Sequence, residues 1–115
     1  MSPGDAPPAA EPSRNEVDAL REPVVIEFGA AYCGHCRAAR PLIAQALVRH
    51  PAARHIKVED GPGRKLGRSF RVKVWPTLIF LRQGQEVARL VRPADVQAID
   101  DALCRIDGAD AKGES

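Results

Sequence analysis

The sequence predicts an α/β domain in which a mixed sheet of about four strands is flanked by helices. Two observations lead to this prediction. Short β-rich runs alternate along the chain with segments whose apolar residues recur at helical spacing. The chain also has 115 residues, 44% of them hydrophobic, which matches one domain with its own buried core.

The first half of the chain predicts two parallel strands joined through a helix. Residues 13–20 open with Ser-Arg-Asn-Glu, a capping box, and predict a short first helix. Residues 24–28 (VVIEF) predict a buried strand, and residues 54–59 (RHIKVE) predict a second one. Apolar residues at helical spacing between them predict a longer helix, which we expect Pro41 to kink. Strands connected in this way pair in parallel.

The second half predicts a helix, a hairpin and a final helix. Residues 64–70 follow a Gly/Pro-rich turn and predict a short helix. Residues 77–82 predict a third strand, and residues 86–91 predict an antiparallel edge strand after a turn at Gln83-Gly84-Gln85. We expect the last helix to open at Pro93-Ala94. Its apolar face comprises Val96, Ile99, Leu103 and Ile106.

The ends of the chain differ from this domain in composition. Residues 1–12 are rich in Pro and Ala, and we expect them to be disordered. The domain then covers residues 13–107, and residues 108–115 form a polar tail. No basic region precedes an apolar run, and no apolar stretch approaches about 18 residues. We therefore expect a cytoplasmic protein without membrane contact, or a periplasmic one only if a leader has been removed.

The charge of the chain argues against a nucleic-acid partner. The formal net charge is +2, too close to neutral for a nucleic-acid or membrane binder. Basic residues nevertheless gather in one segment, which forms either a solvated helix face or a docking surface for an acidic partner. These residues are Arg64, Lys65, Arg68, Arg71 and Lys73.

The sequence Cys33-Gly34-His35-Cys36 follows the first predicted strand and opens the long helix. Disulfide exchange needs a thiolate that attacks and a second thiol that resolves the mixed disulfide. Free N–H groups at a helix N-terminus favour a thiolate, by about 1 kcal/mol or about one pKa unit. We therefore expect Cys33 to attack and Cys36, one turn later and more buried, to resolve. His35 favours the thiolate further if it is protonated or donates a hydrogen bond.

Other uses of a Cys-x-x-Cys pair fit the sequence less well. A structural zinc site needs four ligands, and there is no second Cys-x-x-Cys. The further ligand candidates are Cys104, His35, His50 and His55. Haem attachment requires a histidine where this chain has Arg37. We expect no metal and no cofactor, and a binding module without redox turnover remains open.

Glu27 interrupts an otherwise apolar strand. A buried carboxylate is costly unless it is paired, and its pKa rises, which suits a proton shuttle to Cys36. The alternative is an outward-facing side chain on an edge strand. Lys57 falls on the neighbouring parallel strand, where it is either exposed or close to this acid.

Two segments resemble the thioredoxin superfamily. VVIEFGAAYCGHCRAARPLI is similar to the family's strand, active-site turn and kinked helix, and WPTLIFLRQGQEVARL is similar to its Pro-Thr pair and hairpin. The resemblance covers about residues 20–106, and the CGHC sequence is like that of protein disulfide isomerases. It implies a thioredoxin fold. We expect four strands, because the family's first strand has no clear counterpart before residue 23.

The resemblance also implies residue roles. Cys33 matches the nucleophile and Cys36 the resolving cysteine. Pro76 matches the family's cis-proline beside the disulfide. Glu27 matches the buried acid, and Lys57 matches the lysine that pairs with it.

Several residues depart from the family's pattern or remain outside it. Gly29 and Tyr32 stand where tryptophan or another aromatic residue is usual, and Arg92-Pro93 replaces a small Gly-containing segment. We expect the substrate groove to be lined by Tyr32, Trp75, Pro76 and Arg92. We expect Cys104 to be an inert core thiol and His50 and His55 to be surface residues.

These observations predict a thiol–disulfide oxidoreductase, in the first place a thioredoxin-like reductant. Its substrates are protein disulfides. A separate reductase must recycle it, because the chain has no GxGxxG nucleotide loop. We expect it to act as a monomer. Two alternatives stay open: a disulfide oxidant or isomerase, suggested by His35, and a non-catalytic protein-binding module.

Overall fold

The computed structural model describes residues 11–107, and it contains a four-stranded sheet with helices on both faces. The strands are β1 (Val24–Gly29), β2 (Arg54–Glu59), β3 (Thr77–Arg82) and β4 (Gln85–Val91), in the spatial order β2-β1-β3-β4. β1 pairs in parallel with β2, whereas β3 is antiparallel to both β1 and β4. This mixed, trimmed sheet confirms the predicted fold class.

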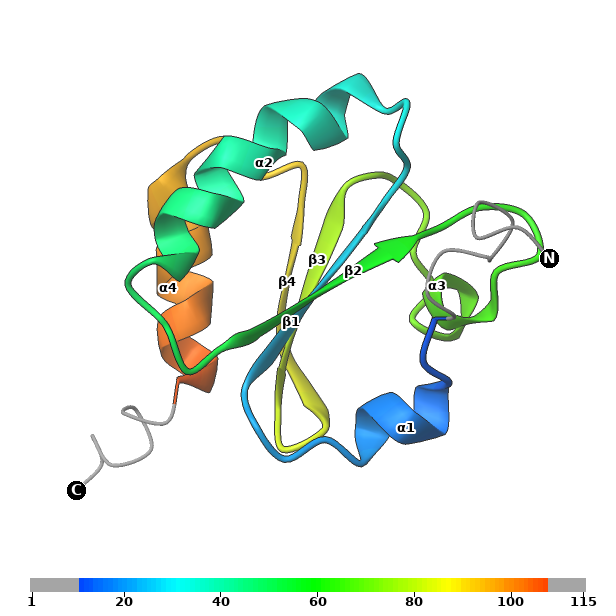
Figure 1. Cartoon of the computed structure of the whole chain (residues 1–115), viewed down its shortest axis with the longest axis horizontal. Coiled ribbons are helices and arrows are strands. Elements are labelled where there is room, and N and C mark those ends of the chain that lie inside the picture. Colours follow the sequence, from blue (N-terminus) through cyan, green and yellow to red (C-terminus); the bar gives the residue numbers. More distant parts are fainter. Residues whose placement is uncertain (1–10, 108–115) are drawn as a thin grey trace, which may run out of the picture.

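Four helices cover the sheet: α1 (Arg14–Asp18), α2 (Gly34–Leu47), α3 (Lys65–Ser69) and α4 (Val96–Ile106). Figure 1 shows α2 and α4 on one face and α1 and α3 on the other. None of the helices in the described part of the chain is long and apolar enough to cross a membrane.

The two faces of the sheet have separate cores. On the α2/α4 side, Val25, Leu78 and Phe80 pack against Ile43 and residues of α4. The core on the α1/α3 side consists of Val17, Val24, Ile26, Phe28, Val58, Leu66, Phe70, Ile79 and Leu81. β1 and β3 are buried on both faces, and this explains why their sequences are almost continuously apolar.

Side chains cap the N-termini of α1, α3 and α4. Ser13 and Glu16 form the predicted capping box at α1. α4 begins later than predicted, at Val96, because Asp95 acts as its N-cap and accepts a hydrogen bond from the Ala98 N–H at 2.9 Å. At α3, Glu11 performs this role from a distance, with its Oε2 accepting from the N–H groups of Lys65 and Leu66 at 3.2 and 3.0 Å. The rest of the expected N-terminal tail and residues 108–115 lie outside the described residues.

The hairpin between β3 and β4 turns at Gln83 and Gly84, where both φ angles are positive, 51° and 79°. Such a turn matches the twist of the flanking strands. A side chain at Gly84 would also collide with the backbone of Asp18, so the hairpin can approach α1 only with glycine there.

His50 is buried after the end of α2, so the expectation of a surface residue is wrong. Its Nδ1 lies 2.8 Å from Asp107 Oδ2 and its Nε2 lies 2.8 Å from Asp100 Oδ1, which connects α2 with α4 and the segment after it. Burial of the ring opposes protonation, but the two carboxylates outweigh it and raise the pKa of His50 above its ordinary value of 6.5. The burial follows from this double pairing.

We expect the His50 pairs to make stability depend on pH. Because the pKa of His50 is raised in the folded state, its stabilising effect is complete below about pH 6.5 and disappears as the pH rises through the folded-state value. Replacing His50 by leucine should cost about 1.5–3 kcal/mol at pH 6, the range for hydrogen bonds to charged groups. Urea unfolding at a series of pH values measures both effects. Parallel stability profiles for the wild type and H50L would contradict this assignment.

Candidate active site

Cys33 is the N-cap of α2 and the first residue of the site. Its Sγ accepts a hydrogen bond from the Cys36 N–H at 3.2 Å. A hydrogen bond from the Cys36 thiol lowers the pKa of Cys33, and backbone N–H groups of Cys36 and His35 and the positive charge of Arg92 act in the same direction. Cys33 is partly exposed, so a stabilised thiolate can reach a substrate.

Cys36 lies one turn further along α2 and is only 1% exposed. Burial raises the pKa of Cys36 to about 11, helped by the hydrogen bond that its thiol gives to Cys33 and by the negative charge of Glu27. The two thiols are therefore chemically unequal. Cys33 is prepared to attack, whereas Cys36 needs a base before it can act.

Gly29, the last residue of β1, makes room for this buried thiol. A Cβ atom at Gly29 would lie only 2.6 Å from Cys36 Sγ. The absence of a side chain at this position thus lets the first turn of α2 close over the end of β1. In this chain a larger residue at position 29 would therefore require the Cys36 side chain to shift.

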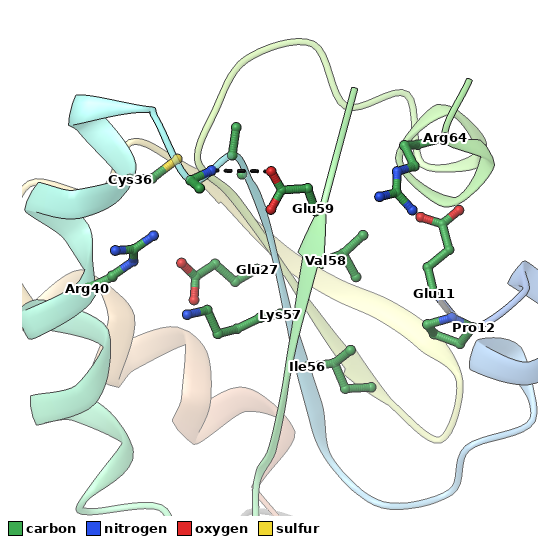
Figure 2. A pocket seen from close by; sticks show the side chains of 13 residues that line it. Glu11, Pro12, Glu27, Cys36, Arg40, Ile56, Lys57, Val58, Glu59 and Arg64 are labelled. Carbon is green, nitrogen blue, oxygen red and sulfur yellow. Dashed lines mark hydrogen bonds between the residues drawn. The ribbon is translucent and has the colours of Figure 1, made fainter. Parts of the chain in front are cut away.

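A cavity of about 380 Å³ extends from Cys36 to Glu27. Figure 2 shows the carboxylate of Glu27 pointing into it, facing Arg40 of α2 and beside Lys57 of β2. Glu27 is 4% exposed, so it is the buried acid that the sequence predicted rather than an outward-facing one. The thiol of Cys36 and the carboxylate of Glu27 share a protected space into which a water molecule fits.

The partner of Glu27 is His55. Its Nε2 lies 2.8 Å from Glu27 Oε1, whereas the structure places no ion pair between Glu27 and Lys57, although the two residues are aligned across β1 and β2. The side chain of His55 is 26% exposed, so the imidazole connects the buried acid with solvent. The expectation of a Glu27–Lys57 pair is corrected here, and His55, although it reaches the surface, also has this buried partner.

A signal for His55 exists in the sequence. Strand alternation puts His55, Lys57 and Glu59 on one face of β2, the face that Glu27 shares on the parallel neighbour. A residue two positions before the aligned lysine therefore lies diagonal to Glu27, within reach of a long or aromatic side chain. Direct alignment with Glu27 points to Lys57 instead, so the diagonal position of His55 was not predicted.

The predicted substrate groove begins with Tyr32 and Trp75, whose rings meet edge to face at 6.4 Å between centroids. Tyr32 is 75% exposed, which is unusual for so large a side chain. The Trp75–Pro76 peptide bond is cis, as the resemblance implied, and Pro76 is buried. Tyr32 directly precedes Cys33 in the chain, and we call Tyr32, Trp75 and Pro76 the rim of the site.

Arg92 completes this rim from the segment after β4. Its Nε donates to the Trp75 carbonyl at 2.8 Å, and its own N–H donates to the Pro76 carbonyl at 3.0 Å. Its φ angle is 50°, in the left-handed region that favours glycine. These two hydrogen bonds hold an arginine where the family pattern has a small glycine-containing segment.

Asp60 is a second residue that the sequence analysis missed. Its Oδ2 accepts a hydrogen bond from Trp75 Nε1 at 2.9 Å and so fixes the indole. Gly67 of α3 leaves space for this carboxylate, since a side chain there would collide with it. The orientation of Trp75 thus depends on residues from two other segments.

The remaining predicted site residues have smaller roles. Gly34 and His35 are exposed in the first turn of α2, and within the described region the His35 imidazole makes no hydrogen bond to Cys33. His35 therefore acts on Cys33 through its backbone N–H. Cys104 is exposed, not a core thiol as expected, because it lies on the outer side of α4.

One group of side chains has the composition of a metal site. Ligand atoms of His50, Asp100 and Cys104 lie within 4.8 Å of one another. Both imidazole nitrogens of His50 are already bonded to carboxylates, so the arrangement satisfies its polar groups as it stands.

We expect the Gly29 contact to matter for stability. Changing Gly29 to alanine should cost about 1–3 kcal/mol, the usual effect of overpacking, because the new methyl group meets the Cys36 sulfur. Gly34 is the matched control, since a Cβ there meets nothing within 4 Å and alanine suits a helix better by about 1 kcal/mol. Thermal unfolding of G29A and G34A compares them, and equal stability of the two variants would contradict the argument.

Comparisons with known proteins agree with this geometry. The family model described as Thioredoxin matches residues 9–105. Thioredoxin H-type from Fagopyrum esculentum is 31% identical over 68 residues, which are 59% of this chain and 59% of that protein. The chain thus spans about three fifths of the length of this curated relative.

Two solved structures are similar over more of their length. Thioredoxin 2 from Pseudomonas aeruginosa PAO1, in its reduced form, is 51% identical with a TM-score of 0.78, covering 89% of this chain and 94% of that one. Thioredoxin O2 from Arabidopsis thaliana, in its oxidized state, is 28% identical with a TM-score of 0.67, covering 83% and 90%. With a Cys33–Cys36 pair at the start of α2, a cis bond before Pro76 and a family match over most of its residues, this chain belongs to the thioredoxin family.

Proposed function

We propose that the chain is a thiol–disulfide oxidoreductase that reduces disulfide bonds in proteins. The observation that carries this proposal is the inequality of the two thiols. Cys33 is accessible and its pKa is lowered, whereas Cys36 is buried with a pKa of about 11. A pair of this kind suits an ordered reaction in which one thiol attacks and the other waits.

In the first step the Cys33 thiolate attacks a substrate disulfide. A bond forms between Cys33 Sγ and one substrate sulfur, and the other substrate sulfur leaves as a thiolate that takes up a proton. The rim of Tyr32, Trp75 and Pro76 receives the polypeptide around this disulfide, since Tyr32 directly precedes Cys33 and its ring meets that of Trp75, the residue bonded to Pro76. The product of this step is a mixed disulfide on Cys33.

In the second step Cys36 resolves the mixed disulfide. Its proton passes to the carboxylate of Glu27 across the shared cavity, and the Cys36 thiolate then attacks Cys33 Sγ. The second substrate sulfur leaves, so the substrate disulfide has gained two electrons and Cys33–Cys36 has become a disulfide. His55 Nε2 accepts the proton from Glu27, and its exposed ring passes a proton to solvent.

The direction of the reaction follows from how Cys33 is stabilised. A strongly oxidising disulfide requires a greatly stabilised thiolate. The contacts on Cys33 are backbone hydrogen bonds, a thiol and one exposed arginine, and the His35 imidazole does not bond to it. These contacts favour the reductant over the oxidant or isomerase. A separate reductase then has to return two electrons to the pair.

The same role suggests the setting in which the chain acts. A dithiol reductant works where other thiols are kept reduced, so we propose a cytoplasmic location. We also propose that the chain acts as a monomer, because its site is assembled from residues of one chain.

Cysteine variants test the order of the two steps. We expect C33S to reduce insulin disulfides at the uncatalysed rate, whereas C36S should accumulate a mixed disulfide that mass spectrometry of the intact protein detects. C104S is the matched control and should keep the wild-type rate, because Cys104 lies on α4 away from the redox pair. If C33S keeps full activity, Cys33 has no part in the reaction. If C33S leaves substrate binding intact and the wild type shows no reduction at all, the chain is a binding module.

Variants of the buried acid test its partner. We expect H55L to slow the resolving step by about tenfold, part of the 10²–10⁴ that general acid–base catalysis contributes. The measurement is release of a thiol from a preformed mixed disulfide on Cys33. H55Q can still bond to Glu27 but cannot relay a proton, so it separates positioning from proton transfer. A slow K57M variant beside an unaffected H55L would assign the role to Lys57 instead.

A further inference from the structure

A hollow of about 280 Å³ lies beside Trp75, and three cations line it. Arg64 precedes α3, Arg68 lies in α3 and Lys73 lies in the segment that leads to Trp75. We call these three residues the basic surface. The remaining residues around the hollow are Asp60, Gly61, Pro62, Val72 and Trp75.

Arg68 and Lys73 are exposed, and Arg64 is half-buried with its guanidinium facing the carboxylate of Glu11 (Figure 2). None of them forms an ion pair with any residue between 11 and 107, whereas Arg14, Arg54 and Arg89 each pair with a carboxylate. Asp60 is the one acid that lines the hollow, and its Oδ2 is bonded to the Trp75 indole. The hollow therefore keeps a net positive charge that faces solvent.

The basic surface continues the rim on which a substrate is proposed to lie. Trp75 contacts both parts, because its indole borders the hollow and meets Tyr32, next to Cys33. The Trp75 carbonyl also holds Arg92, whose positive charge acts on Cys33. A polypeptide with its disulfide at Cys33 that passes over Trp75 consequently reaches Arg64, Arg68 and Lys73.

We infer that the basic surface binds an acidic segment of the protein whose disulfide is reduced at Cys33. This inference rests on the proposed function and adds a class of substrate to it: disulfide proteins with Asp or Glu residues near the reactive cysteine. Exposed charges of this kind mainly accelerate association and exclude partners of the wrong sign. A nucleic acid brings no disulfide to the pair, and the net charge of the whole chain is only +2.

Two matched peptides test the inference in a single turnover. Each carries one cysteine as a mixed disulfide with thionitrobenzoate, flanked on one side by three Glu residues or by three Gln residues. The Cys33 thiolate bonds to the peptide sulfur and displaces coloured thionitrobenzoate, and Cys36 then displaces the peptide thiolate, so the pair loses two electrons and the mixed disulfide gains them. The second-order rate constant of colour release measures recognition, and no recycling reductase is needed.

The test variant is R68E/K73E, and the control R21E/R105E makes the same change in net charge at exposed positions outside the basic surface. Circular dichroism checks that both variants are folded. We expect R68E/K73E to slow the Glu peptide by about tenfold or more, in line with electrostatic steering, and to change the Gln peptide less than about twofold. At about 1 M salt, where the screening length is about 3 Å, the preference for the Glu peptide should vanish.

Other results would overturn the inference. An equal loss for both peptides, a loss of the same size in R21E/R105E or a preference that salt leaves unchanged would each show that the basic surface does not select acidic substrates. A thymidine oligonucleotide of equal charge that competes more strongly than the Glu peptide would reassign the surface to nucleic acid. A wild-type protein that releases colour from neither peptide would refute the proposed function itself, and the inference with it, and this result differs from the loss of a preference.

Discussion

The site depends on how closely the first turn of α2 approaches the end of β1. Four residues separate the last strand residue, Gly29, from the first helical residue, Gly34, so the helix N-terminus must lie over the strand. This places Cys33 at the N-cap, where N–H groups meet its sulfur, and buries Cys36 against a backbone that has no side chain. The same connection therefore lowers the pKa of one thiol and raises that of the other. The redox asymmetry is a consequence of chain geometry rather than of one activating residue.

Buried and exposed charges serve different purposes around this pair. Glu27 lies inside the protein, where a carboxylate is tolerated only with a partner, and His55 provides it from a strand 28 residues further along the chain. The charge of Glu27 therefore acts on groups that line the cavity beside Cys36. Arg68 and Lys73 are exposed and Arg64 is half-buried, and surface charges of this kind attract an approaching partner over about 8 Å at physiological salt. The residues that transfer protons and the residues that select a partner can therefore change independently of each other.

The elements were predictable because their signals are local, and the errors arose where a residue meets a partner distant in sequence. β2 and β3 have the predicted bounds, and the capping box, the hairpin and the mixed sheet follow from residues that are neighbours in the chain. His50 was wrongly placed on the surface, and the bond between His55 and Glu27 was not predicted, because the carboxylate partners lie 28 to 57 residues away. Cys104 was wrongly predicted to be buried because it lies one position beyond a residue of the apolar face of α4. Tertiary pairing decides whether a polar residue is buried, and single-sequence periodicity does not contain that information.

β1 shows how one strand can serve stability and chemistry at once. Its alternate residues Val24, Ile26 and Phe28 enter the apolar core on the α1/α3 side. On the opposite face, Val25 belongs to the α2/α4 core. The next two positions on this face carry an acid, Glu27, and a residue without a side chain, Gly29, instead of large apolar residues. Apolar side chains on that face therefore give way to polar groups and to the Cys36 sulfur, and the cavity borders Glu27 and Gly29 there. β1 tolerates this interruption of its apolar packing because its other face and its two neighbouring strands hold it in register. A redox thiol and its base can be buried here without loss of the fold because the apolar layer on the α1/α3 side remains complete.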